Sequence, residues 1–332
     1  MEKIAIIGLG LIGGSIALAL KEAGLKDVRI VGNARTRDTL QRAQKIGAID
    51  DGYATPEDAA RDARVVIIAA PILATKQIFE DIAPVLGEGT VVTDAGSTKA
   101  NVMRWAKEIL PAHAFFVGGH PMAGKETQGI DAAESSLFRD KTWVLVPPAD
   151  APEGAVRTVV GIAQACGANP VFMDAEEHDS YVAAISHLPL ALSSALFSVA
   201  FGSAAWPELA SLASSGFKDT TRLASGSPEM AHDIVMTNRD NIIHWIDRFQ
   251  VELSRFREMI ATGESKAVLE TFGKPQFERD NYMVSGPPRR DQFGPQVENV
   301  GLGDLLLGTK ISGYLKKQQE MIKDMESREK KR

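Results

Sequence analysis

Short apolar runs alternate with longer amphipathic segments over the first 174 residues. The runs are rich in β-branched and aromatic side chains, as expected of strands that are buried on both faces of a sheet. Between them, segments such as 16–23 and 40–46 carry apolar residues three or four positions apart, which is the spacing of one helix face. This alternation predicts an α/β domain with a doubly wound parallel sheet over residues 1–174. The predicted strands are 4–7, 28–31, 65–69, 90–93, 115–117, 143–146 and 171–173.

The pattern changes near Asp174, where the strand-like runs end. From residue 176 to 262 apolar residues recur at helical spacing, which predicts an all-helical second domain over 175–262. A long apolar stripe on a helix is typical of a core or of a contact between helices, and we expect this domain to form a homodimer. The clearest stripe comprises Ile242, Ile243, Ile246, Phe249, Leu253 and Phe256.

The last segment, 263–332, has prolines among charged residues and glycines, a composition that is typical of a linker. We expect it to form a linker and a charged, partly disordered tail, with a charged amphipathic helix over 311–331 as the alternative. The prolines are Pro275, Pro287, Pro288 and Pro295.

The composition narrows the class of protein. The 332 residues include 37 basic and 43 acidic side chains, and the net charge of −6 argues against nucleic acid as a partner. The single cysteine, Cys166, excludes an internal disulfide and has apolar neighbours typical of a core residue. The chain leads directly into a strand and has no run of 18 apolar residues, so we expect a cytoplasmic protein without a signal peptide or membrane span. No metal site is predicted.

Residues 8–13 read Gly-Leu-Gly-Leu-Ile-Gly between the strand 4–7 and a predicted helix. In that position the pattern favours a dinucleotide site of the Rossmann type. Gly8 would make the tight turn, Gly10 would let a pyrophosphate approach the backbone, and Gly13 would allow close packing. The N–H groups of the helix that begins at Leu11 and Ile12 would then face the phosphates. A glycine-rich turn without a ligand is the structural alternative.

Asn33 ends the second predicted strand, where an NAD site ordinarily has an acidic residue for the ribose hydroxyl groups. Arg35, Thr36 and Arg37 follow it. Because an acidic residue would repel a 2′-phosphate and arginine would attract one, these residues favour NADP over NAD. The alternative is that both arginines are solvated loop charges.

His120 lies in the sequence GGHPMAG at 118–124, directly after the apolar run 114–117. The glycines around it predict an imidazole at a strand end with room for a small substrate and a cofactor. Imidazole titrates near neutral pH and therefore suits a general base. Ser97 follows another strand, at the sheet edge where ligands bind in open α/β folds, although it is also a candidate helix cap.

Two further motifs, SHLP at 186–189 and GFKDTTR at 216–222, complete a set that resembles the prephenate/arogenate dehydrogenase family of tyrosine biosynthesis. The other members of the set are the glycine turn at Gly8, the segment 94–99 and GGHPMAG, and all five fall in order over residues 1–262. The resemblance implies a Rossmann domain followed by a helical dimerisation domain, in agreement with the hydrophobic pattern.

The resemblance also implies a role for each candidate residue. His120 would accept the proton of the substrate's ring hydroxyl while hydride leaves the same carbon for NAD(P), and loss of CO2 would give an aromatic ring. Ser97 would orient His120 and the nicotinamide end. Arg222 would bind a substrate carboxylate through its planar fork of donors, and Asp219 would position Arg222 or its loop. The remaining pocket residues would be His187 and Glu126.

The chain departs from the family pattern at three places. Leu190 stands where a second histidine often follows SHLP, and Ala231 stands where an aromatic residue often follows Met230. Nothing after residue 262 resembles a regulatory domain, so we expect no control by tyrosine through such a domain.

The choice of substrate and two other classes of protein stay open. Prephenate carries a ketone where arogenate carries an ammonium, and Glu126 would pair with the ammonium unless it pairs with Lys125. We favour prephenate, with arogenate as the alternative. A β-hydroxyacid dehydrogenase would need a catalytic lysine that 176–217 lacks. A non-catalytic NADP-sensing module would leave His120 and Arg222 without a role.

Overall fold

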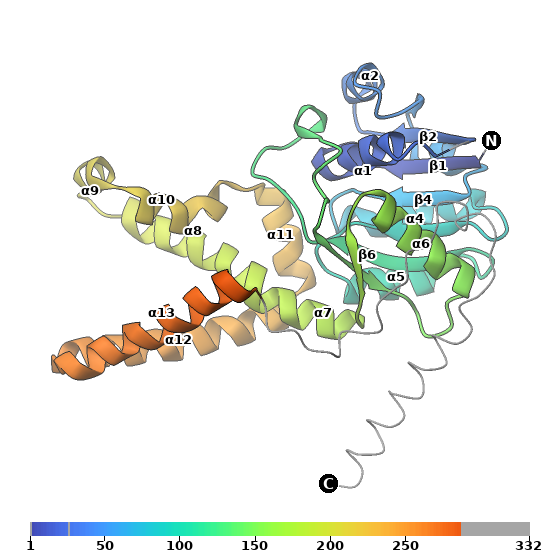
Figure 1. Cartoon of the computed structure of the whole chain (residues 1–332). Coiled ribbons are helices and arrows are strands. Elements are labelled where there is room, and N and C mark those ends of the chain that lie inside the picture. Colours follow the sequence, from blue (N-terminus) through green and yellow to red (C-terminus); the bar gives the residue numbers. More distant parts are fainter. Residues whose placement is uncertain (1, 26, 287–332) are drawn as a thin grey trace, which may run out of the picture.

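The computed structural model describes residues 2–25 and 27–286 (Figure 1). The N-terminal domain is built on an eight-stranded sheet in the order β3-β2-β1-β4-β5-β6-β7-β8. Neighbouring strands pair in parallel except β6 and β7, which run antiparallel. The strands are β1 Glu2–Ile7, β2 Val28–Asn33, β3 Asp51–Tyr53, β4 Val65–Ile68, β5 Val91–Asp94, β6 Phe115–Pro121, β7 Thr142–Val146 and β8 Asn169–Phe172.

The sheet confirms the predicted α/β class, and seven of the eight strands coincide with the predicted runs. The exception is β3, whose three residues contain two polar or glycine positions and offer no apolar run. The first six strands in the sheet follow the order of a Rossmann fold.

Helices cover both faces of this sheet, as Figure 1 shows. On one face, Ile16 and Leu20 of α1 and Val159 of α6 join one apolar core. On the other face, Phe79 of α4 and Val102 of α5 belong to a second core. The helices of this domain are α1 Leu11–Glu22, α2 Arg37–Lys45, α3 Pro56–Ala60, α4 Ala74–Ile82, α5 Ala100–Ile109 and α6 Glu153–Ala165.

The carboxyl edge of the sheet collects the candidate residues. Strand order reverses between β1 and β4, and ligands bind at such a switch point. β6 also extends to this edge, but its two halves have different partners. Residues 115–117 pair with β5, and residues 118–121 pair with β7. His120 therefore lies beyond the last residue of β6 that β5 pairs.

A helical domain follows, as predicted from the change of pattern at Asp174. In Figure 1 it forms two arms that diverge from the sheet domain, one with α8, α9 and α10 and the other with α12 and α13. Its elements are α7 Ala175–Val182, a π-helical turn Ala183–His187, α8 Leu188–Phe201, α9 Trp206–Leu212, α10 Ser215–Thr221, a 3₁₀ turn Arg222–Ser225, α11 Pro228–Thr237, α12 Arg239–Thr262 and α13 Ser265–Ser285.

α13 corrects the prediction of a linker over the start of 263–332. Gly263 ends α12 in the left-handed conformation, at φ +69°, and a second long helix then begins. Phe272 of α13 packs edge-on against Phe256 of α12, with ring centroids 5.7 Å apart. Pro275 lies inside α13, so the proline that suggested a linker is tolerated within a helix. Residues 287–332, where a charged tail is predicted, lie outside the described residues.

α7, the π-helical turn and α8 form one continuous helical run, Ala175–Phe201. Among the described residues, this run alone is long and apolar enough to cross a membrane by length and composition, with a mean hydropathy of 1.7 in its most apolar window. Polar residues are scattered along the run, so it contains no uninterrupted stretch of 18 apolar residues. A helix that is covered by a second subunit has the same composition.

Candidate active site

Two of the three glycines in the turn 8–13 are required by the fold. Gly8 has a φ of +100°, and a Cβ there would lie 2.4 Å from the carbonyl oxygen of Ala69. A Cβ on Gly13 would lie 1.9 Å from the carbonyl oxygen of Gly8. At Gly10, by contrast, a Cβ would meet nothing within 4 Å. Gly8 and Gly13 thus serve the turn and the packing of α1, whereas the space at Gly10 is open to a ligand.

The start of α1 is suited to an anion. Gly10 is the N-cap, no side chain caps the helix, and its first turn contains no acidic residue. Leu11 and Ile12, the first two helical residues, are half-buried. The backbone N–H groups of this turn therefore have no side-chain partner and lie at the positive end of the helix dipole. This arrangement fits the pyrophosphate of a dinucleotide.

The residues after β2 fit the sequence prediction only in part. Asn33 is buried, and its side chain donates a hydrogen bond to the carbonyl oxygen of Tyr53 at 3.1 Å. Thr36 is the N-cap of α2, since its hydroxyl accepts from the backbone N–H of Thr39 at 3.2 Å. Arg35 and Arg37 are exposed, and neither forms a salt bridge within the described chain. Two exposed arginines therefore follow β2, and the charge of Arg35 also acts on the carboxylate of Glu229.

The glycines before His120 serve the packing of the protein itself. A Cβ on Gly118 would lie 2.8 Å from Sδ of Met103, and one on Gly119 would lie 2.5 Å from the carbonyl oxygen of Asp94. The interpretation of this glycine pair as room for substrate and cofactor is therefore wrong. At Gly124, on the other side of His120, a Cβ would meet nothing within 4 Å.

A buried ion pair fixes the strand end that carries His120. Lys99 Nζ bonds to Asp94 Oδ2 and also donates to the carbonyl oxygen of Gly119 at 2.7 Å. The N–H of Gly119 in turn donates to Asp94 Oδ1 at 3.0 Å. Burial lowers the pKa of Lys99, and the charge of Asp94 opposes that shift. The pair thereby ties β5 and the start of α5 to β6.

His120 is linked to two buried residues of α7. Its Nδ1 lies 2.9 Å from Nε2 of His178, and the two rings meet edge to face. Nδ1 of His178 lies 2.8 Å from Oδ1 of Asp179. Burial lowers the pKa of His120 well below 6.5, and its neighbours His178 and Lys99 act in the same direction. His120 is therefore neutral at neutral pH, as a general base must be.

His187 lies in the same cluster, at the end of the π-helical turn. Its Nδ1 accepts a hydrogen bond from the side-chain amide of Asn238 at 3.1 Å. The same amide donates to the carbonyl oxygen of Asp179 at 2.7 Å, and its oxygen accepts from Asn241. Burial lowers the pKa of His187 to about 4. The ring is thus neutral, and its remaining proton is on Nε2.

Ser97 is half-buried at the carboxyl edge, but within the described residues its hydroxyl makes no hydrogen bond to His120 or to any other group. It does not cap α5 either. The N-cap of that helix is Lys99, and Asp179 accepts hydrogen bonds from the N–H groups of Lys99 and Ala100 at 2.7 and 2.9 Å. The assignment of Ser97 to catalysis stays a prediction.

Arg222 and Glu126 meet across the two domains. They form an ion pair between the 3₁₀ turn after α10 and the loop after β6, and both side chains are exposed. Lys125 pairs with Glu134 at 2.6 Å, so the alternative pairing of Lys125 with Glu126 is wrong. Asp219 is exposed and forms no salt bridge with Arg222, and its predicted positioning role has no support in the described contacts.

Four residues that surround His120 and His187 are given no role by the sequence prediction, although one of them, Lys99, lies in the motif 94–99: Lys99, His178, Asp179 and Asn238. The acidic neighbours of His178 and Asp179 suggest a solvated helix start, and only the fold shows that both residues are buried. In the sequence, the only indication of their role is that a histidine and an aspartate stand next to each other near the start of the second domain. Within residues 2–25 and 27–286, no group of three or more His, Cys, Asp or Glu side chains is arranged to hold a metal.

A Rossmann sheet with an open glycine turn, beside a neutral histidine on the same carboxyl edge, defines a nicotinamide-dinucleotide-dependent dehydrogenase. Comparison with known families agrees. Residues 16–172 match the family model described as prephenate dehydrogenase, nucleotide-binding domain, and residues 174–274 match the one described as prephenate dehydrogenase, dimerization domain. The chain belongs to the prephenate dehydrogenase family.

Individual relatives lead to the same family. A prephenate dehydrogenase of Bacillus subtilis is 34% identical over 281 residues, which are 84% of this chain and 76% of the relative. The crystal structure of A. aeolicus prephenate dehydrogenase in complex with hydroxyphenyl propionate and NAD+ is 29% identical, with a TM-score of 0.79 over 85% of this chain and 98% of that one. Synechocystis arogenate dehydrogenase is 28% identical, with a TM-score of 0.71 over 84% and 99%.

Proposed function

We propose that this protein oxidises and decarboxylates prephenate to 4-hydroxyphenylpyruvate, with transfer of hydride to NAD(P). The observation that carries the proposal is His120, a neutral imidazole that lies at the carboxyl edge of the dinucleotide-binding sheet in a chain of this family. A general base at that place suits the removal of a hydroxyl proton.

In the proposed reaction His120 accepts the proton of the ring hydroxyl at Nε2. Nδ1 is engaged with His178, and Nε2 has no hydrogen-bond partner among the described residues, so it is available to the substrate. As the O–H bond breaks, the carbon that bears the oxygen becomes a carbonyl carbon and gives up its hydride, for which a bound nicotinamide supplies the acceptor. The bond to the ring carboxylate then breaks, CO2 leaves, and its electron pair makes the ring aromatic while the carbonyl oxygen becomes a phenolate. That oxygen takes back the proton from His120, which gives the phenol and restores the neutral imidazole.

The neighbouring residues hold His120 ready for this step. Lys99 places a positive charge in the cluster, which disfavours a second positive charge on His120 before substrate arrives. His187 is neutral and presents Nε2–H as a donor, which suits an oxygen of the substrate. Lys99 thus helps to keep the His120 imidazole neutral, and His187 offers one hydrogen-bond donor beside it.

The opposite end of the substrate meets Arg222 and Glu126. Arg222 supplies a planar pair of donors that suits a carboxylate, and its contact with Glu126 holds it at the junction of the domains. Glu126 is engaged by Arg222 in that contact and would have to exchange partners to bind an ammonium. This pairing favours prephenate, which has a ketone there, over arogenate, which has an ammonium.

For the cofactor we propose a preference for NADP. Arg35 and Arg37 supply two positive charges after Asn33, which stands where an NAD site ordinarily has an acidic residue. Arg35→Ala is expected to weaken NADP binding by about tenfold or more while NAD binding changes little, because only NADP carries the phosphate. An equal effect on both cofactors would contradict this preference.

Four assays test the proposal directly: reduction of NAD+ and of NADP+ with prephenate and with arogenate. We expect the fastest reduction with prephenate, and 4-hydroxyphenylpyruvate as the product. Faster turnover of arogenate, with tyrosine as the product, would establish the alternative. Absence of turnover in all four combinations would overturn the proposal of an enzyme.

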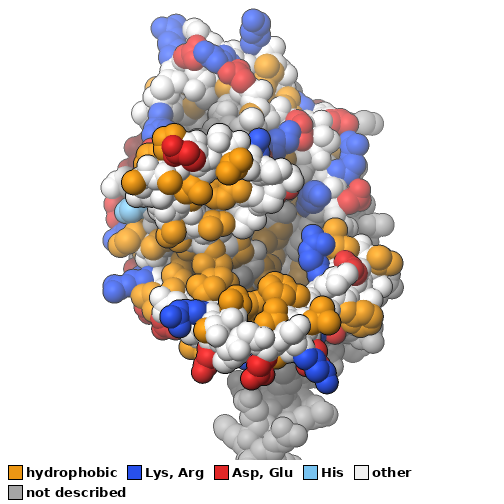
Figure 2. Space-filling view, turned by 90° about the vertical axis from the view of Figure 1, so that its left-hand side faces the viewer, with side chains coloured by type: hydrophobic (Ala, Val, Ile, Leu, Met, Phe, Trp, Pro, Cys, Tyr) orange, Lys and Arg blue, Asp and Glu red, His pale blue; other side chains and the backbone are white. Residues whose placement is uncertain are grey.

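We further propose that the helical domain forms a homodimer. α8 has only two buried residues, Leu188 and Ser193, although its sequence is apolar on all sides. Val199 of α8 is 77% exposed, and Leu212 of the next helix, α9, is 81% exposed. Figure 2 shows hydrophobic side chains gathered around a hollow on this face. The matched family model describes this part of the chain as a dimerization domain.

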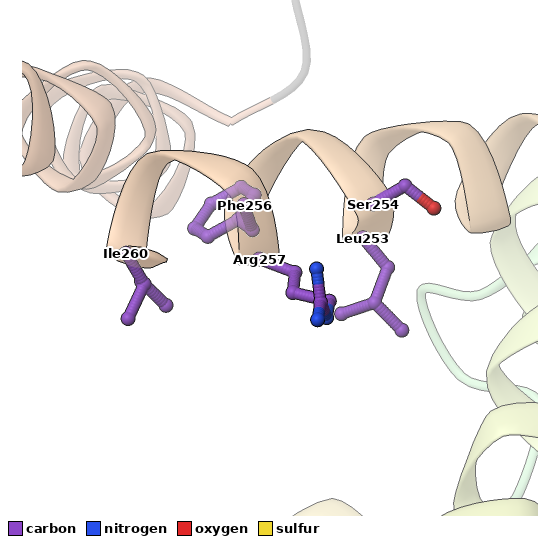
Figure 3. Close-up of a pocket in the computed structure, with 5 residues that line it drawn as sticks. All are labelled: Leu253, Ser254, Phe256, Arg257 and Ile260. Atoms are coloured by element: carbon purple, nitrogen blue, oxygen red, sulfur yellow. The ribbon is translucent and has the colours of Figure 1, made fainter. Parts of the chain in front are cut away.

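α12 also exposes apolar side chains, such as Leu253 and Ile260. Figure 3 shows a pocket on this helix that contains no candidate catalytic residue and is lined along one helix face. A pocket formed by a single helix is open on its other side, as expected where another chain completes it. Its lining residues are Leu253, Ser254, Phe256, Arg257 and Ile260.

Light scattering after size-exclusion chromatography tests the dimer. We expect twice the chain mass of 35.8 kDa for the unmodified protein and a shift to the monomer for Val199→Glu. Ile46→Glu, at an exposed apolar residue of the sheet domain, is the matched control and is expected to stay dimeric. A monomeric unmodified protein would contradict the proposal.

For the cellular setting we propose a reducing cytoplasm, which the single buried cysteine, Cys166, supports.

A further inference from the structure

We propose that His178, fixed by Asp179, is a positioning residue that keeps the proton of His120 on Nδ1 and leaves Nε2 as a hydrogen-bond acceptor. This inference rests on the proposed role of His120 as the base. It concerns which of the two ring nitrogens holds the proton, which decides whether a neutral histidine can accept a proton at a given atom.

The direction of the hydrogen bonds starts at Asp179. Its Oδ1 accepts the backbone N–H of Lys99 at 2.7 Å, and its Oδ2 accepts that of Ala100 at 2.9 Å. A group that receives two N–H donors from the start of a helix is held as a carboxylate, which is an acceptor only. The contact between Asp179 Oδ1 and His178 Nδ1 at 2.8 Å therefore has the histidine as donor.

The next bond follows from the first. With its one proton on Nδ1, His178 presents a lone pair at Nε2, which lies 2.9 Å from Nδ1 of His120. Two lone pairs cannot form a hydrogen bond, so His120 must donate from Nδ1. Its own Nε2 then carries the lone pair that the proposed reaction requires.

The charges around the pair favour this neutral arrangement. The groups that act on His120 are the ammonium of Lys99 and the rings of His178 and His187, and each disfavours a positive charge on it. Asp94 holds Lys99 in this position through a direct ion pair. The other possibility is an imidazolium at His178, which would donate to His120 and place the remaining proton of His120 on Nε2, where it would block the base.

Burial makes the positioning firm. His178 is 1% exposed and Asp179 is 2% exposed, so water does not compete for these hydrogen bonds. Asn238 also donates to the backbone carbonyl of Asp179 at 2.7 Å, which holds that residue against the start of α12. The whole chain of contacts therefore depends on the packing of the helical domain against the sheet domain.

Nitrogen-15 NMR of the histidine rings tests the proton position directly, in the full chain and without substrate. The chain has six histidines, so selective labelling gives a spectrum that can be assigned by single substitutions. We expect His120 as the Nδ1–H form at pH 7. A ring of His120 that is protonated at Nε2 would overturn the inference, whatever the activity.

Two variants at the same position separate positioning from packing. His178→Phe keeps an aromatic ring but offers no lone pair, whereas the side-chain oxygen of His178→Gln can accept the bond from Nδ1 of His120. We expect kcat for prephenate to fall about 100-fold in His178→Phe, with KM little changed, and to recover most of that loss in His178→Gln. His113→Gln, near the opposite end of β6, is the matched control and is expected to keep the wild-type kcat.

The outcomes distinguish the inference from the function on which it rests. If His120→Asn retains turnover, the proposed base is wrong, and the NMR result still decides the proton position. If His120 is essential while His178→Phe keeps the wild-type kcat and tautomer, only the positioning role is overturned. Equal losses of kcat in His178→Phe and His178→Gln would indicate a packing effect and would also contradict the inference.

Discussion

His187 gives a quantitative prediction about the pH dependence of stability. Burial lowers its pKa from 6.5 to about 4. In the unfolded chain the imidazole takes up a proton below pH 6.5, while in the folded protein it stays neutral until about pH 4. The stability contributed by the neutral, buried ring is therefore complete above pH 6.5 and is lost as the pH falls toward 4.

The magnitude follows from the size of the shift. At about 1.4 kcal/mol for each pKa unit, the protonation difference at His187 removes up to about 3 kcal/mol of unfolding free energy, of which about 2 kcal/mol is lost between pH 7 and pH 5. His187→Asn retains an acceptor for the amide of Asn238 but cannot titrate. The variant should therefore lose about 2 kcal/mol less than the unmodified protein over this interval.

Urea unfolding followed by circular dichroism at pH 7, 6 and 5 measures this difference. The comparison uses the change of unfolding free energy with pH, so a constant loss from the smaller side chain cancels. His244→Asn removes an exposed imidazole of the same domain and should follow the unmodified protein, because that ring loses little hydration on folding. Parallel pH dependences for His187→Asn and the unmodified protein would refute the reasoning.

Three further predictions concern the sheet domain. Gly13→Ala should unfold at a clearly lower temperature, because its Cβ would overlap the carbonyl oxygen of Gly8, whereas Gly10→Ala should melt like the unmodified protein but bind dinucleotide more weakly by calorimetry; equal melting of both variants would contradict the packing argument. Lys99→Met should destabilise the fold by about 3–5 kcal/mol in urea, because it leaves the buried carboxylate of Asp94 without its partner. Lys76→Met, at an exposed lysine of α4, is its control, and a similar small loss in both would refute a structural role for the pair. Glu126→Gln should raise KM for prephenate with little change in kcat, since it releases Arg222 from its fixed position; an unchanged KM would remove Glu126 from the site.

Local sequence patterns were sufficient for those parts of the fold that depend on neighbours in sequence. The strand runs and the glycine turn at Gly8 are short-range features, and Gly8 and Gly13 have the conformational and packing roles expected of them. β3 was not predicted, because its three residues include one aromatic side chain and are too few to show a hydrophobic period. α13 was not predicted, because Pro275 within it is typical of a linker, whereas the packing of Phe272 against α12 is a tertiary contact.

The site was predictable only where a motif identified it. His120 and His187 lie in one cluster, and Arg222 pairs with Glu126, as residues of a shared site would. The partners that decide their chemistry come from other elements: His178 from α7, Lys99 from the start of α5, and Asn238 from the start of α12. Such contacts depend on how the two domains pack, and no spacing along the chain reveals them. For the same reason, Gly118 and Gly119 were assigned to a ligand when they accommodate Met103 and Asp94.

The most direct test of the proposed chemistry is a single-turnover measurement on the unmodified protein and on His120→Asn, with prephenate and saturating cofactor. The account predicts that reduced cofactor, CO2 and 4-hydroxyphenylpyruvate form in equal amounts with the unmodified protein. For His120→Asn it predicts a rate lower by about 100-fold or more, with cofactor binding retained. A variant that turns over prephenate at the unmodified rate would contradict the assignment of His120 as the base.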